Sequence, residues 1–253
     1  MIKIKNLFYS PVKSISFTES DSLNILKDIG VEDDRIFAFV HNMDISKIKN
    51  LIEDPKSRKL NNFITLKNTP ELNKYNFTYT KDKLILKKQD EIIISINPFF
   101  ENEKKLLCKK INQIIIKDKT LELLMDENNP FFDTMPENSV SLINKKSIDD
   151  FSKRVSEDIE FERFRANIYI DGLDAWAERT WIGKSIKINN VNFVVLDEIS
   201  RCSATNLKPS TDMVTFNLPN QLKKNYDHIN MGLYLVPLQN GVISKGDKLI
   251  IHD

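Results

Sequence analysis

A short segment near residue 200 combines a cysteine, an arginine and small polar side chains. Ser200, Arg201 and Cys202 follow an apolar run that is typical of a β-strand. A cation beside a thiol favours the thiolate, the form of cysteine that attacks electrophiles and binds soft metals. Cysteine is also among the residue types most often buried, so the segment alone fits a small buried residue at a strand end as well. Cys108 lies in an apolar stretch of helical spacing and is expected to be buried.

A second candidate segment, residues 161–170, carries polar side chains at alternate positions. This alternation predicts that Arg163, Arg165 and Asn167 share one side of the chain as it enters a strand. Guanidinium groups bind phosphate or carboxylate through paired hydrogen bonds, and a neighbouring amide can donate or accept beside them. The alternative is a solvated edge with salt bridges, which four nearby acidic residues favour: Glu157, Asp158, Glu160 and Glu162.

A third candidate is the turn Ser-Pro-Val-Lys-Ser at residues 10–14. Proline restricts its backbone, and the turn offers the Lys13 ammonium and the Ser14 hydroxyl to an anion. Arg35 would join them if the strand after the turn pairs with the strand after residue 35. A lysine in a turn is usually only hydrated, so this segment identifies no site by itself.

Charge and hydropathy narrow the function classes. The chain has 253 residues, and 37 Lys and Arg against 36 Asp and Glu leave a net charge of +1, which gives no general attraction to nucleic acid or to acidic membranes. No apolar run approaches the roughly 20 residues of a membrane helix, and the first residues alternate charged with apolar side chains, unlike a signal peptide. We therefore expect a cytoplasmic protein of one or two domains that binds neither nucleic acid nor membrane.

Residue counts exclude several kinds of site. Two cysteines cannot form a disulfide framework or hold an iron–sulfur cluster, and the three histidines lie far apart in the chain. A His-rich metal site and a zinc knuckle are therefore close to excluded. Six glycines form neither G-x-G-x-x-G nor G-x-x-x-x-G-K-[ST], which argues against a nucleotide held on a Gly-rich loop.

Short alternating runs predict a mainly β (β/α+β) protein, with no repeats. The expected strands are 1–8, 15–17, 35–40, 62–66, 77–79, 84–87, 91–96, 168–170, 185–188, 191–197 and 248–252. Helical spacing predicts helices at 100–112 and 147–155, the second beginning at Ser147 as its N-cap.

The candidate segments occur in an order that resembles one known family. Ser-Pro-Val-Lys-Ser at 10–14, Gly-Val-Glu-Asp-Asp-Arg at 30–35, Arg-Ala-Asn at 165–167, Ser-Arg-Cys at 200–202 and Gly-Val-Ile-Ser-Lys-Gly-Asp at 241–247 resemble the MOSC proteins, relatives of the carboxy-terminal domain of molybdenum cofactor sulfurase. Within that family, the chain resembles the mitochondrial amidoxime-reducing component and its bacterial relatives. The resemblance implies an N-terminal β-barrel at residues 1–118 packed on a MOSC β-barrel domain at 119–253, with a few peripheral helices and the pocket between them.

The resemblance also implies a cofactor and its site. The cofactor is the molybdenum cofactor, Mo-molybdopterin, and Cys202 is the implied metal ligand and catalytic residue. The implied cofactor-binding residues are Lys13, Ser14, Arg35, Arg165, Asn167, Ser200, Arg201 and Thr205. Family-level descriptions also attach pyridoxal phosphate binding to MOSC proteins.

Three residues depart from the family pattern. Ala166 stands where many members have proline, Lys67 where relatives often have arginine, and Asn144 where a small hydroxyl residue is usual. If residue 67 contacts the cofactor, lysine in place of arginine removes a planar guanidinium group and its paired hydrogen-bond donors. The chain ends after its closing strand, so we expect no appended ferredoxin domain and an external electron-donor protein of ferredoxin, flavoprotein or cytochrome type.

The resemblance implies an oxidoreductase that reduces N-hydroxylated small molecules such as amidoximes, hydroxylamines or N-hydroxylated bases, and we expect a monomer. Two alternatives stay open. In the first, Cys202 carries a persulfide and the chain is a sulfur carrier. In the second, the chain is a non-catalytic module that binds the molybdenum cofactor.

Overall fold

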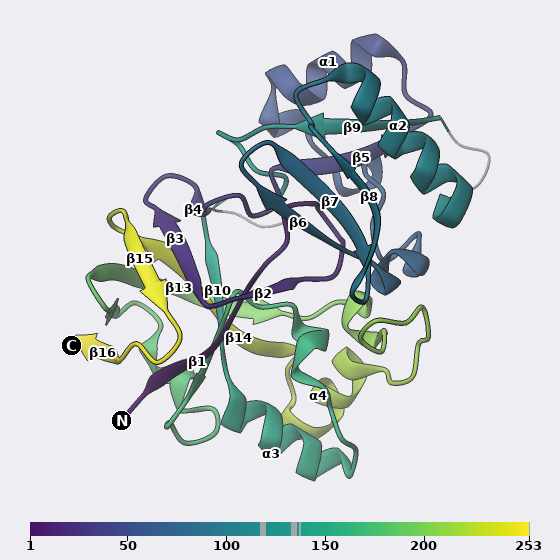
Figure 1. Ribbon diagram of the computed structural model, residues 1–253. Helices are drawn as coiled ribbons and strands as arrows, with labels where there is room; N and C mark the ends of the chain where they lie inside the picture. The colour runs from purple at the N-terminus through teal and green to yellow at the C-terminus, as the bar shows by residue number, and fades with distance from the viewer. Residues whose placement is uncertain (117–119, 133–135, 137, 253) are drawn as a thin grey trace.

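The computed structural model describes residues 1–116, 120–132, 136 and 138–252 and confirms the mainly β class. Its helices are α1 (Ile45–Glu53), α2 (Glu101–Ile111), α3 (Lys145–Val155) and α4 (Leu218–Tyr226). Shorter helical turns are η1 (Pro55–Ser57), η2 (Leu60–Asn62), η3 (Pro70–Lys74), η4 (Asn112–Ile116), η5 (Phe161–Phe164), η6 (Ala177–Trp181) and η7 (Ser203–Asn206). Figure 1 shows two groups of elements, one containing α1 and α2 and the other containing α3 and α4.

The larger group is built on an eight-stranded sheet in the order β16-β12-β13-β14-β10-β11-β1-β2. Its strands are β1 (Lys3–Tyr9), β2 (Thr18–Ser20), β10 (Val140–Asn144), β11 (Ile168–Asp171), β12 (Ser185–Ile188), β13 (Val191–Ser200), β14 (Asn230–Pro237) and β16 (Leu249–His252). Backbone hydrogen bonds of Ile2 and Ile4 with residues 246–249 join β1 to the segment that leads into β16. The sheet therefore closes on itself, and alternate side chains such as Val191, Phe193 and Val195 fill its interior.

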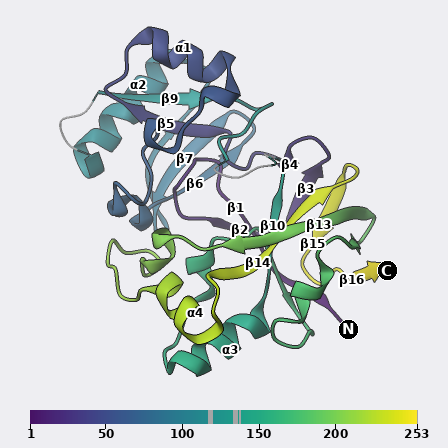
Figure 2. The ribbon, with the colours of Figure 1, turned by 180° about the vertical axis from the view of Figure 1, so that it is seen from behind.

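The smaller group contains two further sheets (Figures 1 and 2). One pairs β5 (Phe37–His41) with β9 (Leu121–Met125), and the other is the meander β6 (Asn76–Thr80), β7 (Lys83–Lys88) and β8 (Glu91–Ile96). A third small sheet, β15 (Gly241–Ser244), β3 (Ser22–Leu26) and β4 (Gly30–Val31), lies beside the large one. The β5 and meander strands share one apolar core with the turn at residues 10–14, which contributes Val12.

β1 and β2 lie within the predicted first domain but pair in the sheet that contains the strands after residue 140. The boundary near residue 118 stays a prediction. Within the part of the chain that the structure describes, no helix is both long and apolar enough to cross a membrane.

Three sequence-based expectations for single elements are wrong. Residues 15–17 form one bridge, from Ser16 to Asn76, and the strand in this region is β2 (Thr18–Ser20). Residues 62–66 form one bridge, from Phe63 to Val40, instead of a strand. The Asn68 side chain accepts from the Thr65 N–H and donates to the Phe63 carbonyl, so local side-chain bonds replace strand pairing there.

Helix α3 begins earlier than expected because Asn144, not Ser147, caps it. The Asn144 side chain accepts from the Lys146 N–H at 3.1 Å. The Ser147 hydroxyl instead donates to the buried Glu178 carboxyl at 2.6 Å, and Asn144 donates to the other oxygen of that carboxyl at 3.0 Å. Asn144 therefore has a structural role at this helix end.

The partly buried carboxyl of Asp33, in the turn before β5, makes the stability of the chain depend on pH. Burial, together with Glu32 and Glu127, raises the pKa of the Asp33 carboxyl from 3.8 to about 6. A raised folded-state pKa means that the folded chain binds more protons between about pH 4 and pH 6, so this group lowers stability as pH rises through that window. Asp33→Asn should therefore raise the free energy of unfolding by about 1–2 kcal/mol at pH 7.5 and by almost nothing near pH 4.

Urea unfolding at the two pH values measures this difference. Asparagine tolerates the left-handed backbone that Asp33 adopts, with φ 62°. The matched control is Asp28→Asn, at an exposed aspartate of the preceding turn. An equal stabilisation at both pH values would contradict the argument.

Candidate functional site

One cavity collects all nine residues that the sequence resemblance selected. It has a volume of about 350 Å³ and is lined by Lys13, Ser14, Arg35, Arg165, Asn167, Ser200, Arg201, Cys202 and Thr205, among others. These residues come from the turn after β1, the segment before β5, the entry to β11 and the end of β13. We call it the Cys202 cavity. The cations of the first two segments thus meet the cysteine of the last, which the chain order alone did not ensure.

Cys202 is the N-cap of η7, two residues after the end of β13, and its side chain is exposed. Its carbonyl accepts from the Thr205 hydroxyl at 2.8 Å and from the Thr205 N–H at 3.1 Å, while its thiol has no hydrogen bond with a described residue. Thr205 thus holds the turn that presents the thiol, and its hydroxyl is already engaged. The thiol itself is available to an electrophile or a soft metal.

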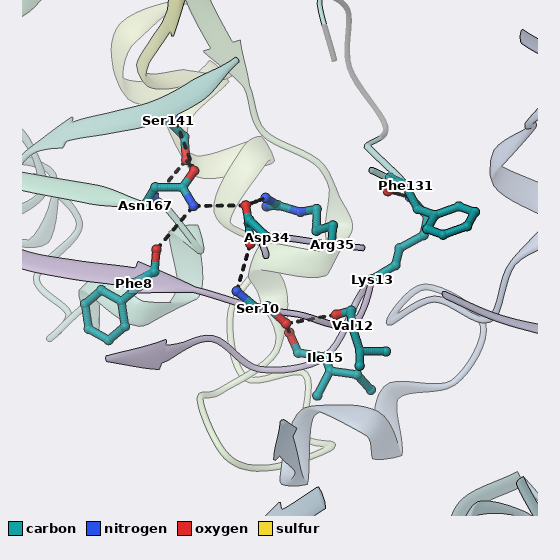
Figure 3. Close-up of polar contacts among 10 residues, drawn as sticks. All are labelled: Phe8, Ser10, Val12, Lys13, Ile15, Asp34, Arg35, Phe131, Ser141 and Asn167. Atoms are coloured by element: carbon teal, nitrogen blue, oxygen red, sulfur yellow. Dashed lines mark hydrogen bonds and ion pairs between the residues drawn. The ribbon is translucent and has the colours of Figure 1, made fainter. Parts of the chain in front are cut away.

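The turn at residues 10–14 lies against the segment before β5 through backbone hydrogen bonds. The Arg35 N–H donates to the Ser10 carbonyl at 2.7 Å, and the Lys13 N–H donates to the Phe37 carbonyl at 2.8 Å. The Lys13 ammonium is buried and donates to the Phe131 carbonyl at 2.9 Å (Figure 3). Lys13 therefore brings its charge into the cavity wall.

Three residues that line the cavity have a left-handed backbone. Ser14, Arg35 and Arg165 have φ values of 60°, 59° and 53°. Each such residue costs about 1–2 kcal/mol relative to an ordinary conformation, because the Cβ atom approaches the following carbonyl oxygen. Strain of this kind tends to occur where function fixes a side chain in place.

Two arginines of the cavity lie over the same aromatic ring. The guanidinium carbons of Arg35 and Arg165 are 4.9 and 4.8 Å from the centroid of the Phe17 ring, and Arg35 is also 5.0 Å from the Phe132 ring. Cation–π contacts of this length hold the planar groups in one orientation. Phe17 therefore positions both guanidinium groups, a role that the sequence did not indicate.

A buried carboxylate joins Arg35 to Asn167. Asp34 accepts from the Ser10 N–H at 2.8 Å and from the Asn167 amide at 3.1 Å, and it forms an ion pair with Arg35 (Figure 3). The Asn167 amide also donates to the Phe8 carbonyl at 3.2 Å, and its oxygen accepts from the Ser141 hydroxyl at 2.7 Å. The Asn167 side chain is thus engaged on both its donor and acceptor sides, and it ties β1, β10 and β11 together beneath the cavity.

Arg201 lines the cavity but directs its hydrogen bonds into the protein. Its Nε donates to the Met231 carbonyl at 2.8 Å, its Nη1 donates to the Phe164 carbonyl at 2.8 Å, and its Nη2 donates to the Met231 carbonyl. Burial lowers the pKa of Arg201 to about 10. Gly232 leaves room for this side chain, because a Cβ atom there would lie 3.3 Å from Arg201 Nη2 and 2.5 Å from the Leu142 carbonyl oxygen.

Ser200 and Arg163 differ in their placement. The Ser200 hydroxyl lines the cavity and donates to the Asn230 side chain at 2.9 Å. Arg163 lies outside this cavity, which corrects the expectation that it shares one side of the chain with Arg165. Residues 161–164 form η5 instead of a strand, and Arg163 donates to Glu160 at 2.6 Å and to the Asn206 carbonyl at 3.0 Å.

Sequence reasoning missed three hydroxyl groups of the cavity. Thr65, Ser139 and Tyr234 line it, and their hydroxyls form no hydrogen bond with a described residue. They come from separate elements and carry no shared motif, so no spacing signal pointed to them. Lys67, noted above as a departure from the family, also lines the cavity.

The charge of the cavity lining favours an anion. Five cations line it, namely Lys13, Arg35, Lys67, Arg165 and Arg201, and no described lining residue is an aspartate or glutamate. The buried Asp34 behind Arg35 offsets one of these charges. Ammonium and guanidinium donors with a nearby thiol suit a ligand that carries a phosphate and a soft metal.

Comparison with known proteins identifies a domain in the second half of the chain. Residues 129–250 match the family model described as the MOSC domain, so the chain contains a MOSC domain. That segment carries Arg165, Asn167 and the Ser200–Thr205 part of the cavity.

Individual relatives fall into two groups. Molybdenum cofactor sulfurase of Caenorhabditis briggsae is 26% identical over 257 residues, which cover 92% of this chain and 33% of that protein. Mitochondrial amidoxime-reducing component 1 of Homo sapiens is 26% identical over 122 residues, which cover 44% of this chain and 36% of that protein. The chain thus matches about a third of the length of each relative. The crystal structure of the YUAD protein from Bacillus subtilis aligns with 100% of this chain at a TM-score of 0.48 and 10% identity.

Proposed function

We propose that the Cys202 cavity binds the molybdenum cofactor and that the chain reduces N-hydroxylated small molecules. The observation that carries the proposal is a single exposed thiol on the wall of a cavity lined by five cations and no described carboxylate. The names of the relatives, which include amidoxime-reducing components and molybdenum cofactor sulfurases, support the same cofactor.

Each group of cavity residues has a distinct task in this proposal. The Cys202 thiolate is the protein's ligand to molybdenum, and the metal would keep that thiol deprotonated. Lys13, Arg35 and Arg165 hold the phosphate, with the Ser14 hydroxyl as a neutral donor. Asn167, Arg201 and Thr205 position these groups through the hydrogen bonds described above.

When bound, the cofactor supplies two-electron chemistry at the metal. The overall reaction is R–NHOH + 2 e⁻ + 2 H⁺ → R–NH₂ + H₂O, in which the N–O bond breaks and the oxygen leaves as water. The electrons come from an external electron-donor protein of ferredoxin, flavoprotein or cytochrome type. This chain's cations and hydroxyls hold the cofactor in place beside Cys202.

The first test is the metal content of the chain expressed in a host that makes the cofactor. We expect close to one molybdenum per chain, a pterin released on oxidation, and reduction of benzamide oxime to benzamidine with a chemically reduced viologen as electron source. Absence of both metal and pterin would contradict the proposal.

A sulfur carrier is the second candidate, and one observation favours it. The sulfurase relative aligns with 92% of this chain, against 44% for the amidoxime-reducing relative. The exposed Cys202 thiol would then hold a persulfide sulfur received from a partner protein. Mass spectrometry that finds one added sulfur on Cys202, without bound molybdenum, would favour the carrier. Bound cofactor without turnover under any electron donor would instead favour the non-catalytic module.

Tyr234→Phe tests the hydroxyls that sequence reasoning missed. The Tyr234 hydroxyl has no hydrogen-bond partner among the described residues, so its removal should change the free energy of unfolding by less than about 0.5 kcal/mol. If the hydroxyl contacts the cofactor, cofactor retention should fall about three- to tenfold, which corresponds to one hydrogen bond. Thermal melting and molybdenum content after dialysis measure the two effects, and Tyr75→Phe is the control outside the cavity. Unchanged retention would remove Tyr234 from the binding set.

A further inference from the structure

A second cavity adjoins the Cys202 cavity and has a different lining. Its volume is about 90 Å³, and the rings of Phe8, Phe17 and Tyr169 form part of its wall. Phe8 and Tyr169 pack edge to face with their ring centroids 5.7 Å apart. We call it the aromatic cavity. At about 30 Å³ per water molecule, its volume equals about three waters, on the order of one six-membered ring.

Three polar side chains in the wall of the aromatic cavity, those of Tyr169, Ser16 and Asn73, are already engaged with protein. The Tyr169 hydroxyl donates to the Phe161 carbonyl at 2.8 Å and accepts from the Ala166 N–H at 3.1 Å. The Ser16 hydroxyl donates to the Asn73 carbonyl at 2.8 Å, and the Asn73 amide donates to two carbonyls of the 208–211 loop at 2.8 and 2.7 Å. Water in this cavity finds few partners, so an apolar ring can replace it at little loss of hydrogen bonding.

One carboxylate lies at the rim. Glu162 is exposed and lines the aromatic cavity, and its carboxylate forms no hydrogen bond or ion pair with a described residue. The other two charged lining residues are arginines: Arg163 pairs with Glu160, and Arg165 lies over Phe17. Glu162 is therefore an acceptor available to an N–H group attached to a ring in the cavity.

The two cavities share Arg165 and Ala204 as lining residues. Ala204 follows Cys202 by two positions, and consecutive Cα atoms are about 3.8 Å apart, so their Cα atoms lie within roughly 7.5 Å of each other. A ring in the aromatic cavity that contacts Ala204 would hold its substituent near the Cys202 thiol. The cation-lined Cys202 cavity thus suits an anionic cofactor, and the adjoining aromatic cavity suits the apolar ring of a substrate.

We propose that the aromatic cavity is the subsite for the planar ring of the substrate, with Glu162 accepting an N–H of the substituent that extends toward Cys202. This inference rests on the proposed reduction of N-hydroxylated compounds. It adds that ring-bearing neutral substrates bind better than ringless ones of the same functional group.

The test compares benzamide oxime with acetamide oxime, which share the functional group and differ in the ring. Isothermal titration calorimetry on the chain isolated from a cofactor-producing host, without electron donor, should give at least about tenfold tighter binding of benzamide oxime. Ser210→Trp fills the cavity from its exposed rim and should abolish this advantage. Ser156→Trp is the matched control, because Ser156 is also exposed and left-handed, with φ 55° against 59° for Ser210.

Two further measurements complete the test. Glu162→Gln should weaken the binding of benzamide oxime about threefold. Glu157→Gln, at an exposed glutamate outside the cavity, should leave this affinity unchanged. Ligand NMR on the native chain should show contacts between the ring protons and Phe8, Phe17 or Tyr169. Equal affinities for the two oximes, or a ring advantage that survives Ser210→Trp, would overturn the proposal. Because no electron donor or turnover enters these measurements, their failure is separate from a failure of the reductase assignment.

Discussion

Cys202→Ala is expected to reduce the molybdenum content of the chain to below about a tenth of the native value and to abolish reduction of N-hydroxylated compounds. A soft metal depends on its thiolate ligand, and alanine offers no replacement. The fold should persist, because the Cys202 side chain is exposed and its thiol has no hydrogen bond with a described residue. The turn around it is held by the Cys202 carbonyl, which alanine retains.

Cys108→Ala is the matched control at the second cysteine. Cys108 is buried in α2, and burial raises the pKa of its thiol to about 12. A thiol in this environment is protonated at neutral pH and unreactive, so its replacement should leave the metal in place and cost roughly 1–2 kcal/mol of stability from lost packing. Elemental analysis and thermal melting of the two variants separate a ligand from a core residue. Full metal content in Cys202→Ala would refute the role of Cys202.

The family resemblance predicted the members of the cavity better than their contacts. Lys13, Arg35, Arg165 and Cys202 belong to the short motifs that carry the resemblance, and all four line one cavity. Each motif sits at a strand end, where the strand fixes its direction.

The contacts depend on long-range packing that no local pattern encodes. Asn167 and Arg201 belong to the same motifs, but their hydrogen bonds reach Phe8, Asp34 and Met231 in other parts of the chain. Alternation failed at residues 161–164 because a helical turn and the left-handed Arg165 replaced the expected strand. The alternation of apolar and polar residues was enough to predict the most regular strands, β7, β8 and β12, which lie close to their predicted positions.

Strands with weaker local signals escaped prediction. β10 and β14 are central strands of the large sheet, buried by neighbours on both sides, so their side chains need not alternate clearly. Their stability comes from pairing with partners far away in the chain, such as Val140 opposite Leu235. Such pairing leaves little trace in a single sequence.

Asn167→Ala is expected to destabilise the chain strongly even without cofactor, because the structure gives this residue a positioning role. Loss of the amide leaves the buried Asp34 carboxylate, the Phe8 carbonyl and the Ser141 hydroxyl short of a partner. Unsatisfied buried groups of this kind cost about 1–3 kcal/mol each, and partial relaxation makes roughly 3 kcal/mol the expected total. For a chain of this size, the melting temperature should fall by about 6–12 °C.

The comparison is made on cofactor-free protein, so that bound cofactor contributes nothing to the measured stability. Asn192→Ala is the control, since the Asn192 amide donates to the exposed Gln239 side chain at 3.1 Å and its loss should lower the melting temperature by about 2 °C or less. If Asn167 only contacted cofactor, its replacement would lower cofactor retention without changing the stability of the cofactor-free chain. A melting temperature within about 2 °C of the native value would therefore refute the positioning role and return Asn167 to the set of direct cofactor ligands. The expected fall would mean that cofactor loss in this variant follows from displacement of Asp34 and Arg35.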